Sequence, residues 1–136
     1  MDIVTAARQA IGTPFRHQGR SLSSGLDCVG FGAYVLDQIG APYVDQRNYG
    51  RRPANGQLEA ALDAQPCLVR VATPEPGDFL LMRFLKAPQH LAICAGATII
   101  HAWDDAGMVC EHTLDATWRA RIVRVYRVID PWGSEA

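Results

Sequence analysis

Residues 90–102 read His-Leu-Ala-Ile-Cys-Ala-Gly-Ala-Thr-Ile-Ile-His-Ala. Two apolar runs flank a glycine, which tolerates the left-handed backbone of a tight turn, so this stretch predicts a β-hairpin folded about residues 95–97. In such a hairpin position 90 pairs with position 101 or 102. His90 and His101 are then expected to be cross-strand neighbours.

Short β-like runs continue on both sides of this hairpin. Residues 67–71 and 78–84 precede it, and residues 108–113 and 122–129 follow it, with Pro-Gly and Ala-Gly pairs between several of them. The last run alternates apolar residues with arginines, as a strand with one solvated face does. The second half of the chain is therefore predicted to be a sheet.

The first half has helical spacing instead. We expect three helices: residues 3–11 after an Asp2 cap, a second from Asp27 that closes at Gly40 and Pro42, and a short third that starts at Asn55 or Gly56 and ends before Pro66. Helices followed by strands predict an α+β fold, with N-terminal helices packed on an antiparallel β-sheet.

Composition bounds the size and the partners of this fold. The chain has 136 residues, 49% of them hydrophobic, so we expect one domain over residues 1–130 and a flexible tail over 131–136. The net charge of -1 argues against nucleic acid or an anionic membrane as a partner. The first residues lack the pattern of a signal peptide, which predicts synthesis in the cytoplasm.

Among the four cysteines, Cys28 is placed differently from the rest. Asp27 suits a helix N-cap, which makes Cys28 the first helical residue, where unpaired N–H groups and the helix dipole stabilise a thiolate. Gly25, Gly30 and Gly32 leave the sulfur open to a substrate or to another backbone segment. We interpret Cys28 as a nucleophile; the alternative is a buried cysteine that packs as a small hydrophobe.

A nucleophilic cysteine needs a base, and the base needs a group that orients it. His90 and His101 supply both from one hairpin, although each could instead be an ordinary hydrogen-bonded residue at a strand end. His17 lies in the loop ahead of Cys28 and can line the cleft. His112 ends another run and is interpreted as solvated.

The other three cysteines fall within apolar runs, and we predict that Cys67, Cys94 and Cys110 are core residues. Zinc ligation by Cys28, Cys94 and the two hairpin histidines is chemically conceivable. No close ligand pair has zinc-finger spacing, however, so we expect neither a metal nor a cofactor.

Five motifs, in this order, give the chain a resemblance to the NlpC-type papain-like cysteine peptidases, which cut bacterial cell-wall stem peptides. They are Ile11-Gly12-Thr13-Pro14-Phe15, Leu26-Asp27-Cys28-Val29-Gly30, Pro76-Gly77-Asp78, His90-Leu91-Ala92-Ile93 and Ile99-Ile100-His101-Ala102. The forms of residues 15–18 and 27–30 look most like the phage-encoded branch, which is found in tail or prophage gene clusters.

The resemblance implies a papain-like fold with Cys28 as the nucleophile, His90 as the general base and His101 as the residue that orients it. It also implies that Asp27 helps to hold the free amino end of a stem peptide. Phe15 stands where many members have a tyrosine, and Val29 where many have a serine that contacts the peptide. His17 is expected to replace part of that polarity.

The predicted function is therefore hydrolysis of amide bonds in peptidoglycan stem peptides. Asp27, His17, Phe15 and Val29 are the candidate substrate-binding residues. Phage tail proteins are the expected partners, and a phage particle is the expected route to the cell wall. Two alternatives stay open: a thioesterase or acyltransferase on a similar scaffold, and a non-catalytic tail component.

Overall fold

The computed structural model describes residues 1–51, 56–84 and 87–129; the predicted tail lies outside the described residues. The elements, in chain order, are α1 (Ile3–Gln9), β1 (Arg20–Ser21), β2 (Gly25–Leu26), α2 (Cys28–Gln38), α3 (Gln57–Asp63), β3 (Leu68–Val71), β4 (Phe79–Phe84), β5 (Ala87–Cys94), β6 (Thr98–Trp103), β7 (Met108–Thr113), α4 (Ala116–Arg119) and β8 (Ile122–Val128). The predicted α+β class is confirmed.

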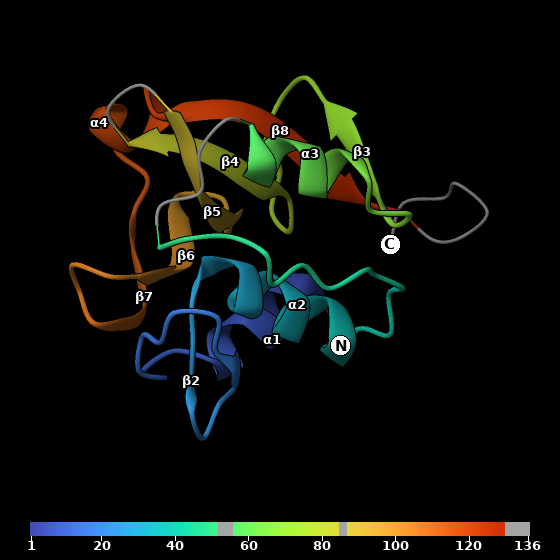
Figure 1. Cartoon of the computed structure of the whole chain (residues 1–136). Helices are drawn as coiled ribbons and strands as arrows, with labels where there is room; N and C mark the ends of the chain where they lie inside the picture. The colour runs from blue at the N-terminus through green and yellow to red at the C-terminus, as the bar shows by residue number, and fades with distance from the viewer. Residues whose placement is uncertain (52–55, 85–86, 130–136) are drawn as a thin grey trace.

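The six longer strands form one antiparallel sheet in the order β3-β8-β4-β5-β6-β7. Helices α1 and α2 lie together on one side of this sheet (Figure 1). Phe31 and Val35 of α2 are fully buried there against strand residues such as Phe79 and Ile93. Burial of such side chains stabilises the fold by roughly 1.5–3 kcal/mol each.

The opposite face of the sheet has its own smaller core. Leu80, Ala92 and Ile99 pack there with Trp118 from the one-turn helix α4. Successive side chains of a strand alternate between faces, so even-numbered residues of β5 and odd-numbered residues of β6 share this second face. His90 and His101 therefore lie on the side away from α1 and α2.

The histidine-bearing hairpin forms, but its register differs from the prediction. Cys94 pairs with Ile99 and Ile93 with Ile100, and the turn consists of two residues, with Gly96 at a φ of +94°. A two-residue turn shifts the pairing by about one position relative to the expected three-residue turn. The two imidazoles consequently meet diagonally rather than directly opposite one another.

Three elements and one strand boundary were not expected from the sequence. The two-residue strands β1 and β2 pair within a loop, α4 covers the second face, and β5 begins at Ala87 although Pro88-Gln89 predicts a turn. Proline lacks the N–H that a strand ladder uses. Pro88 is accommodated because the β4–β5 register shifts between Met82 and Arg83, next to it.

Most of the core cysteine prediction is confirmed. Cys67 and Cys94 are buried, whereas Cys110 on β7 is half-buried, so its assignment to the core was wrong. The reason is its position on the edge strand of the sheet, where one side of the strand has no neighbour to cover it. All four cysteines are free thiols.

A buried ion pair ties the start of β4 to β8. Asp78 is 2% exposed, and its carboxylate oxygens accept hydrogen bonds from Nε and Nη2 of Arg127 at 3.0 and 2.9 Å. Removal of one partner leaves a buried charge without its counter-ion. Arg127→Met is therefore expected to lower the free energy of unfolding by about 3 kcal/mol, as measured by urea denaturation.

An exposed pair supplies the control for this measurement. Arg70 pairs with Asp63 where both side chains are substantially exposed, and exposed pairs contribute about 0–1 kcal/mol. Arg70→Met is expected to cost no more than that. Equal losses for the two variants would contradict the assignment of Asp78 as a buried charge that depends on its partner.

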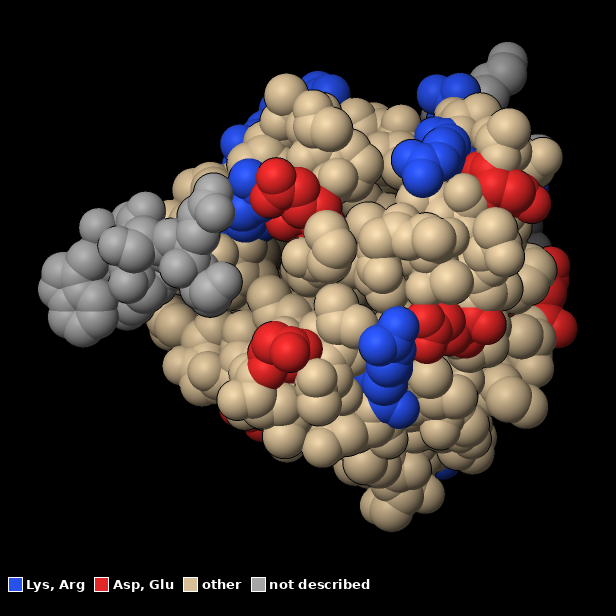
Figure 2. Space-filling view, turned by 180° about the vertical axis from the view of Figure 1, so that it is seen from behind, with Lys and Arg blue, Asp and Glu red and all other residues tan. Residues whose placement is uncertain are grey.

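On the face seen from behind in Figure 2, basic and acidic side chains adjoin one another on a largely uncharged surface. This agrees with the near balance of 13 basic and 14 acidic residues. Within the described parts of the chain, no helix combines the length and the apolar character that crossing a membrane requires.

Candidate active site

The first residue of α2 is Cys28, as the sequence predicts. Asp27 is the N-cap: its Oδ1 accepts a hydrogen bond of 2.7 Å from the N–H of Gly30, and its carbonyl accepts one from the N–H of Phe31. The cap fixes where the helix begins. It thereby places the thiol among the unpaired N–H groups of the first turn.

The thiol itself is less exposed than the sequence suggests, since Cys28 is only 9% exposed. Burial raises the pKa of Cys28 to about 12, and the nearby Asp27 carboxylate acts in the same direction. Backbone N–H groups, including that of Leu91, oppose this shift. Desolvation in the folded protein thus opposes the stabilisation that the helix start gives a thiolate, and the role of Cys28 as a nucleophile stays a prediction.

His90 and His101 are brought together as predicted. Nε2 of His90 and Nδ1 of His101 are 2.6 Å apart, and the residues are 4% and 0% exposed. Burial lowers the pKa of His90 to about 3, with the positive charge of Arg121 as a further cause, and burial also lowers the pKa of His101. Both imidazoles are therefore neutral at neutral pH.

Aromatic rings hold the two imidazoles in place. Phe84 stacks on His90 with ring centroids 4.9 Å apart, and Trp103 stacks on His101 at 5.4 Å. Trp118 meets His101 edge-on at 5.2 Å. The aromatic rings cover the flat faces of the two imidazoles and leave their nitrogen-bearing edges free to form hydrogen bonds. The stacking therefore orients the two imidazole rings.

The interpretation of His112 as solvated was wrong. Its ring is half-buried, its Nε2 lies 2.8 Å from Nε2 of His101, and Trp118 packs on it with centroids 4.8 Å apart. β7 is paired with β6, and α4 brings Trp118 over the end of β7. Because α4 was not expected, nothing in the sequence suggested that Trp118 would cover His112.

Cys28 and His90 face a common cavity of about 320 Å³. The β5–β6 ladder pairs only two positions among the described residues, so the strands diverge beside Leu91, which belongs to the same buried cluster as Cys28. The cavity is lined by Phe15, Cys28, Arg51, Phe84, Gln89, His90, Ala102, Trp103, Asp104, Asp105 and Arg121. A thiol and an imidazole at one cavity form the pair that nucleophilic catalysis needs.

The NlpC/P60 family model matches residues 12–127. The chain belongs to the NlpC/P60 family. This stretch contains Cys28, His90 and His101, together with every strand of the main sheet up to Arg127.

Known proteins similar to this NlpC/P60 domain carry consistent names. The chain is 29% identical over 127 residues to a probable peptidoglycan endopeptidase, LytE, of Bacillus subtilis, covering 92% of the chain and 33% of that protein. It is 30% identical over 114 residues to a probable endopeptidase of Corynebacterium glutamicum, covering 83% and 47%. The chain thus spans a third to a half of these relatives.

Among solved structures, the chain resembles the NlpC/P60 domain of the peptidoglycan hydrolase SagA. The TM-score is 0.62 at 27% identity, covering 90% of this chain and 93% of that one. The papain-like fold that the sequence resemblance implies is confirmed by this match.

The candidate substrate-binding residues of the NlpC/P60 domain take different positions. Phe15 lines the cavity of Cys28, whereas Val29 lines a neighbouring apolar cavity between α2 and α3. His17 packs edge-on against Tyr49, with ring centroids 5.7 Å apart. The roles of these three residues toward a peptide stay predictions.

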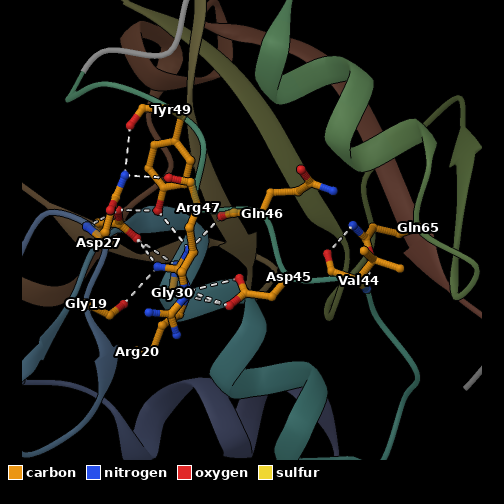
Figure 3. Close-up of polar contacts among 11 residues, drawn as sticks. Gly19, Arg20, Asp27, Gly30, Val44, Asp45, Gln46, Arg47, Tyr49 and Gln65 are labelled. Atoms are coloured by element: carbon orange, nitrogen blue, oxygen red, sulfur yellow. Dashed lines mark hydrogen bonds and ion pairs between the residues drawn. The ribbon is translucent and has the colours of Figure 1, made fainter.

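Asp27 is 3% exposed and its carboxylate is fully engaged (Figure 3). Oδ1 accepts from Gly30 N–H and Arg20 Nη1, and Oδ2 accepts from Gln18 N–H and the Tyr49 hydroxyl, over distances of 2.6 to 3.2 Å. Four donors match the capacity of a carboxylate. Contact of Asp27 with a peptide amine therefore requires one of these donors to leave.

Arg20 and Tyr49 are residues that the sequence reasoning did not find. Arg20 bonds to Asp27, Asp45 and the Tyr49 hydroxyl, so it anchors the segment after α2 beside the nucleophile (Figure 3). Neither lies in a motif or a periodic element. Their link to Asp27 spans 7 and 22 residues, which leaves no local signal.

The described residues hold no cluster of three His, Cys, Asp or Glu side chains that could hold a metal ion. Cys94 bonds to the backbone of Gly96. The nitrogens of His90 and His101 bond to each other.

The buried histidines predict a loss of stability in mild acid. The folded-state pKa of His90 lies near 3, below the value of about 6.5 in the unfolded chain, so the unfolded chain binds more protons between these values. The contribution of the neutral pair to stability is complete above about pH 6.5 and is lost as the pH falls toward 3. Urea denaturation at about pH 7.5 and about pH 5 measures this.

The expected result is a smaller free energy of unfolding at the lower pH. Most carboxylates stay ionised at about pH 5, so the histidines dominate in this window. Equal stability at the two pH values would show that His90 and His101 do not fold as a buried neutral pair.

Proposed function

We propose that this domain is a cysteine peptidase that hydrolyses amide bonds in the stem peptides of peptidoglycan. The observation that carries the proposal is the shared cavity of Cys28 and His90, with His101 bonded to the far side of the His90 ring. The domain belongs to a family whose similar members are named as peptidoglycan endopeptidases or hydrolases, which supports the substrate class.

In the proposed mechanism the thiol and the imidazole both start neutral. His90 takes the Cys28 proton as the sulfur attacks the peptide carbonyl, and the buried site holds the resulting charges close together. The Cys28 N–H at the start of α2 stabilises the oxyanion. His90 then donates its proton to the leaving amine, which gives a thioester on Cys28 that water hydrolyses.

His101 has a distinct part in this sequence. Its Nδ1 lies 2.6 Å from Nε2 of His90. In the proposed mechanism Nδ1 of His101 accepts from Nε2 of His90, so His101 stabilises the imidazolium that forms during attack and keeps the ring oriented. His101→Ala is expected to leave a reduced rate. Cys28→Ala and His90→Ala are expected to abolish it.

We propose that Phe15 contacts the peptide directly, since it lines the cavity. His17 and Asp27 act on the same peptide indirectly, through the segment after α2 that contains Tyr49. His17 packs against the Tyr49 ring, and the Tyr49 hydroxyl bonds to both the Asp27 carboxylate and Arg20. Val29 contacts an apolar part of the peptide from the neighbouring cavity. The free amino end of a stem peptide would displace a donor from Asp27.

The proposal includes a phage setting. Residues 15–18 and 27–30 have the forms typical of the phage-encoded branch, which supports tail proteins as partners and a phage particle as the route from the cytoplasm to the cell wall. Neighbouring genes that encode tail proteins would support this part. A chromosomal setting without phage genes would contradict it.

One observation favours acyl transfer as a second candidate. The apolar cavity of about 410 Å³ between α2 and α3 includes Val29, which follows the nucleophile in the chain, and Leu91, which belongs to the same buried cluster as Cys28. Such a cavity fits an acyl chain attached at Cys28. Acyl donors that modify Cys28 when stem peptides do not would favour this candidate.

The test of the proposed function is mass analysis of purified peptidoglycan after digestion. The expected products are pairs of fragments whose masses sum to that of a stem peptide plus one water. The matched digestion with Cys28→Ala is expected to give none. Intact stem peptides after digestion with the unchanged protein would contradict the proposal.

A further inference from the structure

Three imidazoles form a continuous chain across three strands. His90 on β5, His101 on β6 and His112 on β7 lie on the same face, with nitrogen–nitrogen distances of 2.6 and 2.8 Å. The chain ends at the carbonyl of Thr113, 3.0 Å from Nδ1 of His112. The active site described above uses only the first two rings.

The terminal carbonyl decides the protonation pattern of the whole chain. A carbonyl oxygen only accepts, so Nδ1 of His112 carries a proton, and the neutral ring keeps a lone pair on Nε2. Nε2 of His101 must then donate to Nε2 of His112. Each neutral ring has one proton, so Nδ1 of His101 is an acceptor.

The rule of one proton per neutral ring also assigns the proton of His90. Nδ1 of His101 accepts from Nε2 of His90, so the proton of His90 resides on Nε2 and its lone pair on Nδ1. In the proposed function that lone pair takes the proton of the Cys28 thiol, with which His90 shares a cavity. The opposite pattern would put a proton on Nδ1 of His90 and leave no acceptor for the thiol.

We infer that His112 is a positioning residue that fixes the protonation pattern of His90 through His101. The inference rests on the proposed function because it takes His90 as the general base. Trp103 and Trp118 pack around His101 and His112, which limits the approach of water that could offer a competing partner.

Two substitutions separate this role from packing. His112→Phe keeps a ring against Trp118 and removes the acceptor, whereas His112→Gln places an amide oxygen near the position of Nε2. With His112→Phe, kcat is expected to fall at least about tenfold, because a misdirected base loses part of its contribution, and KM is expected to stay within about twofold. His112→Gln is expected to restore most of kcat.

Two readouts need no peptidoglycan, so they separate this inference from the proposed function. Nitrogen-15 NMR of the unchanged protein is expected to show a protonated Nε2 and an unprotonated Nδ1 on His90, and His112→Phe is expected to mix in the opposite form. Alkylation of Cys28 by iodoacetamide is expected to slow with His112→Phe and to recover with His112→Gln.

The NMR and alkylation results of the two variants decide whether the inference holds. An unchanged His90 signal and an unchanged alkylation rate in His112→Phe would overturn the inference, whether or not the protein cleaves peptidoglycan. Equal losses in the Phe and Gln variants would also overturn it, since they would indicate packing alone. If His112→Phe does not fold, the NMR pattern of the unchanged protein and the rate of His112→Gln decide.

Discussion

Cys28→Ala is expected to lower the rate of stem-peptide hydrolysis at least about 10³-fold, because it removes the thiol that forms the proposed covalent intermediate. The helix start stays intact, since Asp27 caps Gly30 through its own side chain. Removal of a buried sulfur from a small side chain costs little packing. The loss should thus appear in the rate of fragment release while the melting temperature changes little.

Cys110→Ala supplies the matched control for this loss. Cys110 is a free, half-buried thiol on β7 and does not line the cavity of Cys28. Its replacement is expected to leave the rate within about twofold. A similar loss of activity in both variants would show that general thiol chemistry, rather than the position of Cys28, carries the reaction.

Gly30→Ala is expected to damage the site through its backbone. A Cβ at Gly30 would lie 1.9 Å from the carbonyl oxygen of Gly19, a contact that no side-chain rotation can relieve. That carbonyl bonds to Arg20, which bonds to Asp27, so the displaced segment would disturb the cap of α2. Overpacking costs about 1–3 kcal/mol or more, against a gain of about 1 kcal/mol in helix propensity.

The same helix offers a control for Gly30→Ala. A Cβ at Gly32 would meet the tips of Leu91 and Phe79 at 3.0 and 3.2 Å, which are side-chain atoms able to shift by a few tenths of an ångström. Gly32→Ala gains the same helix propensity and is expected to lose less stability and activity. Urea denaturation and hydrolysis rates of both variants check this, and a harmless Gly30→Ala would contradict the predicted collision.

These glycines show what sequence reasoning can and cannot establish. Gly30 was expected to leave the sulfur open to a substrate or another backbone, and the structure shows that another backbone, the Gly19 carbonyl, takes the space. A glycine near a nucleophile indicates a close approach. It does not say what approaches, because the partner lies in a loop without periodicity.

Local signals predicted the elements that carry the chemistry. The Asp27 cap and the Gly96 turn each depend on neighbouring residues, so the start of α2 and the hairpin of the two histidines were predictable. The exact register was not, because two-residue and three-residue turns about Gly96 are both compatible with the sequence.

Burial and long-range contacts account for the remaining errors. The direction of the Cys28 pKa shift depends on how completely the fold covers the thiol, which a motif does not encode. The contact of His112 with His101 depends on the pairing of β7 and on α4, a single turn too short for helical periodicity. The pKa shift of Cys28 and the contact of His112 both depend on how the strands and helices assemble around the sheet.

In the proposed mechanism Cys28 forms a thioester with the carbonyl half of a stem peptide. Acid quenching during turnover of isolated stem peptides, followed by mass analysis of the protein, detects this thioester. We expect a fraction of chains to carry the acyl fragment on Cys28, and none to do so with Cys28→Ala. Steady hydrolysis by the Cys28→Ala variant, with no adduct in either protein, would contradict it.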